Sequence, residues 1–396
     1  MIERGMKYLK NILRPGKSRR IQLDLLRGIA IILVLGRHQF GTRARAGIFQ
    51  VIADKMYLFG WTGVDLFFVL SGFLVGGLLF SGLRSRSLLD AERFIVRRGF
   101  KIWPAYFIYL GYLFIWLVVT ESSGSLKVCF TKLLPNLLHI QNYVISVRYH
   151  TWSLAVEEHF YLLLPLYLYL VTRRRKAGIE SIPSVPLIAA ILVIFCTLLR
   201  YLTVKTYEYS AYAIIFPTHL RIDSLFFGVL ISYLYYFKPD LLRTLARRRA
   251  ALFLCGLALV YPMIIVHLWG SVFVCTIGFV MLYMGYGCIL VSMLYPPEGS
   301  RLWGWFFNSY IARVIAFVGF YSYSIYLWHV DIGFDVVGYL LKHGTFRGLR
   351  ESALWLLTYL MYVLLSVVGG VVMGVIVERP ALALRDRLYP SRSSAV

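Results

Sequence analysis

Apolar stretches as long as a membrane-spanning helix recur along almost the whole of this 396-residue chain. A helix needs about 20 mainly apolar residues to cross the hydrocarbon core of a bilayer. Ten segments approach this length, at 21–40, 60–82, 102–120, 152–171, 186–204, 218–237, 250–267, 271–294, 314–341 and 353–377. Hydrophobic residues make up 59% of the chain, more than the roughly 45–50% of soluble domains. We therefore expect an all-α fold, a polytopic transmembrane helix bundle of about ten helices.

The distribution of positive charge indicates the topology of this bundle. In a soluble protein, a formal net charge of +23 would indicate nucleic-acid binding. This sequence, however, has no polar, soluble basic face that could bind such a partner. If the N-terminus is cytoplasmic, roughly two thirds of the 42 Lys and Arg residues face the cytoplasm and about a quarter lie in outer loops. This asymmetry is the positive-inside rule. We expect both termini in the cytoplasm, the lipid bilayer as a partner, and no nucleic-acid binding.

The chain is expected to form one membrane domain. Residues 1–20 are a basic cytoplasmic segment, 21–377 carry the spans, and 378–396 form a cytoplasmic tail. The first span is long and contains Arg27 and Arg37, so we expect it to stay attached rather than act as a cleaved signal. The five cysteines have neither a disulfide framework nor the spacing of a metal site. No metal is expected.

Two ionisable side chains interrupt the apolar stretch 26–38, and such residues inside a membrane span are functional candidates. Arg27 and His38 are separated by three helical turns plus about 20°, a rise of about 16 Å along one face. The spacing predicts that both line one internal channel, with Arg27 near the cytoplasmic end and His38 near the outer end. The alternatives are that Arg27 reaches the interface or pairs with Asp24, and that His38 only caps the helix.

Further polar side chains are expected near the level of His38, at the outer ends of three other spans. They are Asp65, Ser153, Glu157, Glu158, Arg221 and Asp223. A buried cluster of this kind must be internally paired, and a structural ion-pair network is the alternative interpretation for Arg221 and Asp223. A local hydrolase triad of Ser153 and His159 is excluded, because six residues turn a helix by about 600° and separate the two side chains.

Cations gather at the cytoplasmic end of the third span. Arg97, Arg98 and Lys101 lie on the same side of the membrane as Arg27. Guanidinium groups bind phosphate through paired, charge-assisted hydrogen bonds. Ordinary positive-inside charge is the alternative, but together with Arg27 these residues favour a polyanionic ligand that enters from the cytoplasm and reaches towards His38.

The ninth span combines aromatic and ionisable residues. Tyr321, Tyr323 and Tyr326 more often indicate packing than chemistry, whereas His329 is an imidazole near the middle of the membrane. The sequence does not identify the partner of His329.

The motifs together resemble the acyltransferase-3 family of integral membrane O-acyltransferases over about residues 20–380. They are Arg27-x10-His38, FFVLSGFL (67–74), the basic pattern at 97–104, WSLAVEEHFYLLLP (152–165), RIDSLFFG (221–228), YSYSIYLWH (321–329) and Glu378-Arg379-Pro380. Two departures from the family pattern are Lys101, where arginine is usual, and His159, where glutamine is common. Some relatives carry an extra extracytoplasmic hydrolase-like domain, which we do not expect here.

The resemblance implies transfer of an acyl group, commonly acetyl, from cytoplasmic acyl-coenzyme A to a sugar hydroxyl of an exported glycan or glycolipid. His38 would be the general base, with Asp65, Glu157 or Glu158 orienting its ring. The expected acyl-coenzyme A site comprises Arg27, Arg97, Arg98, Lys101, Trp152, Ser153, Tyr323 and His329. We expect a multi-pass protein of the bacterial cytoplasmic membrane. The alternatives are an acyl-histidine intermediate, a secondary transporter that uses the buried charges as a substrate or proton pathway, and a non-catalytic scaffold.

Overall fold

The computed structural model describes residues 20–39, 47–86, 89–120, 125–173, 181–295, 300–344 and 349–390. All regular structure in these ranges is helical. In chain order the elements are α2 (Ile21–Arg37), α3 (Gly47–Phe59), η1 (Gly60–Thr62), α4 (Gly63–Arg86), α5 (Ala91–Thr120), α6 (Leu126–Leu137), η2 (Tyr149–Thr151), α7 (Trp152–Thr172), α8 (Ser184–Thr206), α9 (Ala211–Ile214), η3 (Thr218–Leu220), α10 (Ile222–Phe237), α11 (Pro239–Arg247), α12 (Arg249–Val260), α13 (Pro262–Ile265), η4 (Val274–Gly278), α14 (Phe279–Leu294), α15 (Arg301–Asn308), α16 (Tyr310–Phe320), α17 (Ser322–Asp331), η5 (Ile332–Val337), α18 (Gly338–Lys342), α19 (Glu351–Met373), η6 (Gly374–Glu378) and α20 (Arg379–Leu388). The protein is the expected helical membrane bundle.

The number of spans differs from the ten expected. Within the described ranges, six helices are long and apolar enough to cross a membrane, or up to eight if each of two bent pairs forms one span. The predicted span 21–40 corresponds to α2, which has only 17 residues. The predicted span 250–267 is divided at Tyr261 into α12 and α13. The structure thus confirms the helical membrane bundle, whereas the count of about ten spans stays a prediction.

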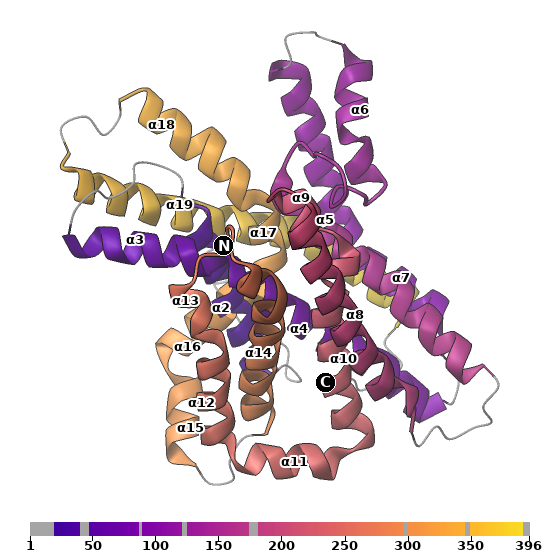
Figure 1. Ribbon diagram of the computed structural model, residues 1–396. Helices are drawn as coiled ribbons and strands as arrows, with labels where there is room; N and C mark the ends of the chain where they lie inside the picture. Colours follow the sequence, from indigo (N-terminus) through magenta and orange to yellow (C-terminus); the bar gives the residue numbers. More distant parts are fainter. Residues whose placement is uncertain are drawn as a thin grey trace, which may run out of the picture.

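Helix α2 lies inside the bundle and packs against α4, α16 and α17 (Figure 1). Its contact with α16 requires glycine on both sides. A Cβ atom on Gly28 would lie 2.0 Å from the carbonyl oxygen of Ile315, and one on Gly319 would lie 1.9 Å from that of Asp24. Small residues let transmembrane helices approach backbone to backbone. This close contact holds the helix that carries both Arg27 and His38.

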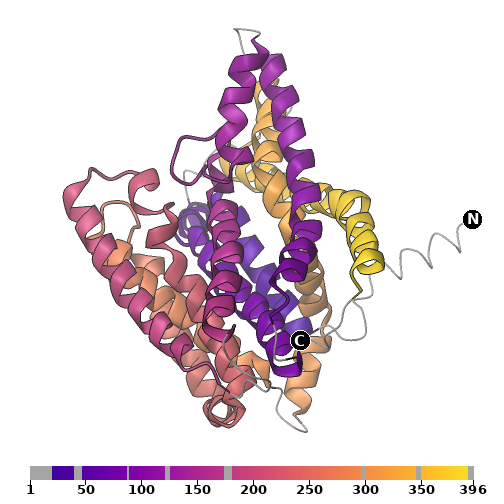
Figure 2. The same ribbon diagram turned by 90° about the vertical axis from the view of Figure 1, so that its right-hand side faces the viewer.

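The hydrophobic core has two large parts, and α2 contributes buried residues to both. One is built mainly from α4, α7, α10 and α14, and the other from α2, α5, α17 and α19. Figure 2 shows α8, α10 and α12 as a slanted layer on one side of the molecule, while α6 and the adjoining half of α5 project together at the top. The outer helices α8 and α19 expose apolar side chains such as Ile194 (70%) and Leu364 (62%), as lipid-facing helices do.

The helix at the C-terminal end continues beyond residue 377, where we expect the membrane domain to end and the cytoplasmic tail to begin. Helices α19, η6 and α20 form one continuous helical segment, Glu351–Leu388. Its last helix, α20, packs against the beginning of α5, where Arg97 pairs with Asp386 at 3.1 Å. Part of the predicted tail is therefore folded onto the bundle.

Candidate active site

Two cavities lie inside the bundle and share residues. The first, which we call the Arg27 cavity, has a volume of about 80 Å³ and is lined by Arg27, Ser71, Arg98, Lys101, Glu157 and Glu158, among others. The second, the His38 cavity, has a volume of about 630 Å³. Val64 and Tyr326 line both. Helix α2 therefore places Arg27 beside one cavity and His38 beside the other. The spacing of these two residues predicts one channel lined by both, and that channel stays a prediction.

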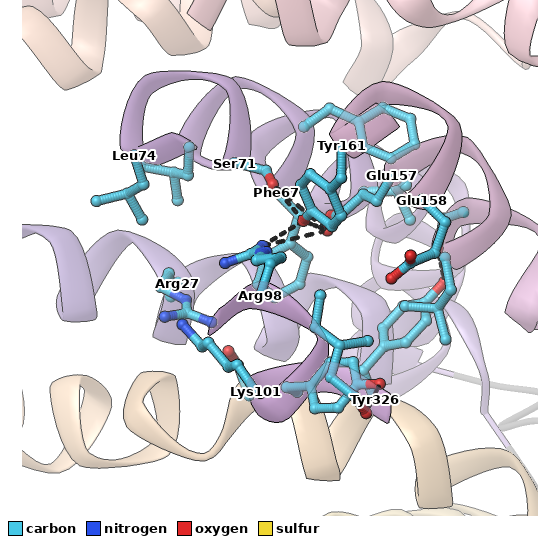
Figure 3. A pocket seen from close by; sticks show the side chains of 18 residues that line it. Arg27, Phe67, Ser71, Leu74, Arg98, Lys101, Glu157, Glu158, Tyr161 and Tyr326 are labelled. Atoms are coloured by element: carbon cyan, nitrogen blue, oxygen red, sulfur yellow. Dashed lines mark hydrogen bonds and ion pairs between the residues drawn. The ribbon is translucent and has the colours of Figure 1, made fainter. Parts of the chain in front are cut away.

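Arg98 is held at the centre of the Arg27 cavity by a hydrogen-bonded group (Figure 3). Its Nη2 donates to the hydroxyl of Tyr161 and lies 4.0 Å from Oε2 of Glu157. Tyr161 in turn donates to Glu157 and lies 2.8 Å from the hydroxyl of Ser71. The guanidinium of Arg98 also sits over the Tyr161 ring, 4.2 Å from its centroid. These contacts hold the guanidinium of Arg98 in one orientation at the wall of the Arg27 cavity.

Two further cations approach the same cavity. Figure 3 shows the side chains of Arg27 and Lys101 next to each other on one side of it. Glu378, whose Oε1 accepts a hydrogen bond from Ser324, lies near enough to interact electrostatically with both. Two basic side chains that converge on a narrow cavity provide the charge and the N–H donors that phosphate groups bind.

Arg97 is directed elsewhere. It pairs with Asp386 of α20 and also donates to the carbonyl oxygen of Tyr389. Successive residues of a helix point about 100° apart, so Arg97 and Arg98 contact different neighbours. The structure brings Arg98 and Lys101 to the cavity and binds Arg97 to the C-terminal helix.

The His38 cavity combines aromatic rings with a buried ion pair. Its lining includes Tyr57, Trp61, Tyr149, Trp152, Phe216 and Trp269. Within this wall, Nη2 of Arg221 lies 2.5 Å from Oδ1 of Asp65, and both side chains are almost fully buried. The Arg221 guanidinium also lies 3.9 Å from the centroid of the Phe279 ring. Asp223 points away and pairs with Arg200.

Four buried polar atoms of residues that line the His38 cavity have no hydrogen-bond partner within the described part of the chain. They are Nε1 of Trp61, Oδ2 of Asp65, Nδ1 of His150 and Nη1 of Arg221. An unsatisfied buried polar atom costs free energy, and each such atom calls for an explanation. Donors and acceptors set among aromatic rings suit a ligand that carries several hydroxyl groups.

The contacts of His38 differ from those expected. Its Nδ1 lies 3.0 Å from the carbonyl oxygen of Val34 and 3.2 Å from Nε2 of His329. The three acids proposed to orient its ring are engaged elsewhere: Asp65 with Arg221, Glu157 with Tyr161, and Glu158 with Nε1 of Trp103 at 3.4 Å. The neighbour of the His38 ring is another imidazole.

Comparison with known proteins shows the family of the chain. A family model described as an acyltransferase domain matches residues 20–375. The chain belongs to this acyltransferase-3 family. O-acetyltransferase OatA of Staphylococcus aureus strain NCTC 8325 is 25% identical over 300 residues, which are 72% of this chain and 47% of OatA. OatA of strain COL gives the same values. The chain spans about half the length of the curated relatives it matches. No solved structure matches it.

Within this family member, most of the predicted site residues line one of the two cavities, whereas Arg97, Asp223 and His329 line neither. Arg27, Arg98, Lys101, Ser153, Glu157, Glu158 and Tyr323 line the Arg27 cavity, whereas His38, Asp65, Trp152 and Arg221 line the His38 cavity. Ser153 and Glu157 thus line a different cavity from His38, although Ser153 Oγ lies 2.6 Å from the hydroxyl of Tyr326, which lines both. The chain enters the bundle before α7, because Gln141, Asn142 and His150 are already buried.

Sequence reasoning does not identify several residues that line the two cavities. Tyr326 was expected only to pack, yet it lines both cavities and its hydroxyl donates to the carbonyl oxygen of His150 at 2.7 Å. Arg37, Trp61 and Tyr149 line the His38 cavity. The proximity of Arg37 to His38 in the sequence is a usable signal, whereas nothing near Trp61 or Tyr149 distinguishes them from interfacial aromatics.

Proposed function

We propose that the protein is a membrane O-acyltransferase that moves an acyl group, acetyl in the simplest case, from cytoplasmic acyl-coenzyme A to a sugar hydroxyl of an exported glycan or glycolipid. The observation that carries this proposal is the pair of neighbouring cavities that share Val64 and Tyr326 as lining residues, with cations beside one and His38 beside the other. The bacterial cytoplasmic membrane is the proposed location.

The Arg27 cavity is the proposed donor site. Arg27 and Lys101 would bind phosphate groups of coenzyme A, and Arg98, fixed by Tyr161 and Glu157, would add a directed donor. The thioester at the end of the pantetheine arm would then lie near Tyr326, which lines both cavities, and a movement of this side chain would open the way to His38. The small volume of this cavity, about 80 Å³, favours a slender chain over a folded ligand.

The His38 cavity is the proposed acceptor site. Aromatic rings such as Trp61 and Trp152 offer apolar faces to a sugar ring. The unsatisfied atoms of Asp65, His150 and Arg221 would exchange hydrogen bonds with its hydroxyl groups. The name of OatA, an O-acetyltransferase, supports a hydroxyl as the acceptor.

The reaction follows from placing both substrates beside His38. The neutral imidazole takes the proton of the acceptor hydroxyl while its oxygen attacks the thioester carbonyl carbon. The carbon–sulfur bond then breaks, and the coenzyme A thiolate takes the proton back from the imidazolium, so the products are an ester and a thiol. A positioned general base contributes typically about 10²–10⁴-fold, and alignment of the two substrates supplies much of the rest.

The experiment that tests this function uses purified protein in lipid nanodiscs with radiolabelled acetyl-coenzyme A. We expect release of coenzyme A and transfer of label to a sugar acceptor, and loss of both in the His38→Ala variant. His343→Ala is the matched control, because His343 is exposed near the end of α18. A transporter would show no thioester cleavage. A burst of label trapped on wild-type protein before acceptor is added would support the acyl-histidine route instead of direct transfer.

A further inference from the structure

A second imidazole, that of His329, is buried against His38. The sequence predicts His329 in the acyl-coenzyme A site, but the residue lines neither cavity. His329 of α17 is completely buried, and its ring centroid lies 5.0 Å from that of His38 in an edge-to-face arrangement. The two residues are far apart in the chain, and Nε2 of His329 lies 3.2 Å from Nδ1 of His38. A polar ring in such a place needs a partner, and here the partner is the proposed general base.

The hydrogen bonds of His329 fix which of its nitrogens carries the proton. Its Nδ1 lies 2.7 Å from the carbonyl oxygen of Tyr326. A carbonyl oxygen only accepts, so Nδ1 must carry the hydrogen. A neutral imidazole has one N–H group, and therefore Nε2 of His329 presents a lone pair to His38.

The same reasoning then determines which ring nitrogen of His38 carries the hydrogen. Two lone pairs cannot form a hydrogen bond, so Nδ1 of His38 must be the protonated nitrogen that donates to Nε2 of His329. The carbonyl oxygen of Val34, 3.0 Å from the same Nδ1, requires the same tautomer. The unprotonated nitrogen of His38 is consequently Nε2, the atom that a general base needs. The tautomer of a catalytic histidine is generally set by the hydrogen bond that its other nitrogen makes.

We propose that His329 is a positioning residue for the acyl transfer reaction. Together with the carbonyl oxygen of Val34, it holds His38 in the tautomer with a free Nε2. It also accepts a hydrogen bond from the imidazolium that forms when His38 takes the acceptor proton. No covalent bond to His329 is made. This inference rests on the proposed function, in which His38 is the base.

The surroundings explain why an imidazole serves here instead of a carboxylate. Asp331, two residues after His329, is bound to Arg148 at 2.6 Å and accepts from Tyr109 at 2.6 Å. A carboxylate beside His38 would add another buried charge to that of Asp331. A buried charge without a partner is costly. A neutral ring supplies the acceptor without that cost.

A third histidine restricts the orientation of His329. The ring centroid of His150 lies 5.1 Å from that of His329, and Nε2 of His150 donates to the carbonyl oxygen of Leu327 at 3.2 Å. His329 is thus enclosed between two imidazoles whose own hydrogen bonds are directed by backbone carbonyls. Rotation of its ring would break the bond to Tyr326 and leave Nδ1 without a partner.

The direct test is solid-state NMR of protein labelled with ¹³C,¹⁵N-histidine in liposomes, because ¹⁵N shifts distinguish protonated from unprotonated ring nitrogens. Difference spectra against His38→Gln and His329→Gln assign the two rings. We expect Nδ1 protonated and Nε2 unprotonated in both. A hydrogen on Nε2 of His38 would overturn the proposal. This readout does not require activity, so it remains valid if acyl transfer itself is not found.

The second test compares two substitutions of similar length. In His329→Gln the side-chain oxygen reaches the position of Nε2 and can accept from His38, whereas His329→Met fills the space without an acceptor. We expect kcat to fall on the order of 10- to 100-fold in the Met variant, a part of the general-base contribution, and about 5-fold or less in the Gln variant. The KM for acetyl-coenzyme A should stay within about 2-fold in both.

A merely structural role for His329 gives a different result. Both variants would then lose melting temperature and activity together, or neither would lose activity, and equal kcat values for Gln and Met at wild-type melting temperature would contradict the proposal. His343→Gln serves as the control for substituting a histidine elsewhere. If His38→Ala keeps full transferase activity, the proposed function fails, while the NMR result still decides the tautomer.

Discussion

Arg221 and Asp65 form an ion pair of 2.5 Å inside the bundle, with only 2% and 1% of their side chains exposed. Removal of one partner from a buried pair leaves an uncompensated charge, which costs about 3–5 kcal/mol. We therefore expect Asp65→Ala to lower the melting temperature strongly. The double substitution Asp65→Leu with Arg221→Met should restore much of the melting temperature but raise the KM for the acceptor, since both residues line the His38 cavity.

An exposed pair provides the control for that measurement. Arg243 and Asp240 lie 3.6 Å apart on α11 with 63% and 95% of their side chains exposed. Surface pairs contribute little because water screens them, so Asp240→Ala should leave the melting temperature nearly unchanged. If the double variant at 65 and 221 keeps a wild-type acceptor KM, the ion pair is structural only.

The second buried ion pair should behave differently, because it faces away from the His38 cavity. Arg200 donates to both carboxylate oxygens of Asp223, at 3.1 and 2.8 Å, and to the carbonyl oxygen of Leu220. We expect Asp223→Asn to lower the melting temperature while the folded fraction keeps the kcat and KM of the wild type. Activity per folded molecule, from thermal unfolding followed by fluorescence beside the transferase assay, checks this. A selective rise in acceptor KM would instead place Asp223 in substrate binding.

Sequence reasoning predicts local geometry well in this protein. Helical periodicity alone puts Arg27 and His38 on one face, and the structure places them beside two neighbouring cavities that share lining residues. Hydropathy likewise predicts the helical membrane bundle. Both are short-range properties, set by the rise and rotation of one helix and by the apolar content of one segment.

Tertiary partners are what the sequence does not reveal. Arg97 and Arg98 are adjacent and chemically identical, yet one pairs with Asp386 and the other with Tyr161, because of how α20 and α7 pack against α5. The partner of His329 lies 291 residues away in the chain. Hydropathy also does not detect that Gln141, Asn142 and His150, in the loop before α7, are buried.

The difference between these two arginines gives a prediction for donor binding. Hydrogen bonds to charged groups contribute about 1.5–3 kcal/mol, and 1.4 kcal/mol is a factor of ten, so Arg98→Gln should raise the KM for acetyl-coenzyme A roughly 10- to 100-fold. Arg97→Gln, on the same helix but bound to Asp386, should change it by less than about 3-fold. Initial rates against acetyl-coenzyme A concentration compare the two. Equal effects would mean that phosphate binding depends on general positive charge and not on the Arg27 cavity.

The close contact between α2 and α16 predicts that a single methyl group will disturb both ends of the site. In Gly28→Ala the new Cβ would meet the backbone oxygen of Ile315 at 2.0 Å, so the helices must separate. Overpacking of this kind costs about 1–3 kcal/mol. Because α2 carries Arg27 and His38, we expect a lower melting temperature, a higher KM for acetyl-coenzyme A and a lower kcat. Gly111→Ala on α5, where a Cβ meets nothing within 4 Å, should leave all three unchanged, and a Gly28→Ala variant equal to Gly111→Ala would show that the site does not depend on this contact.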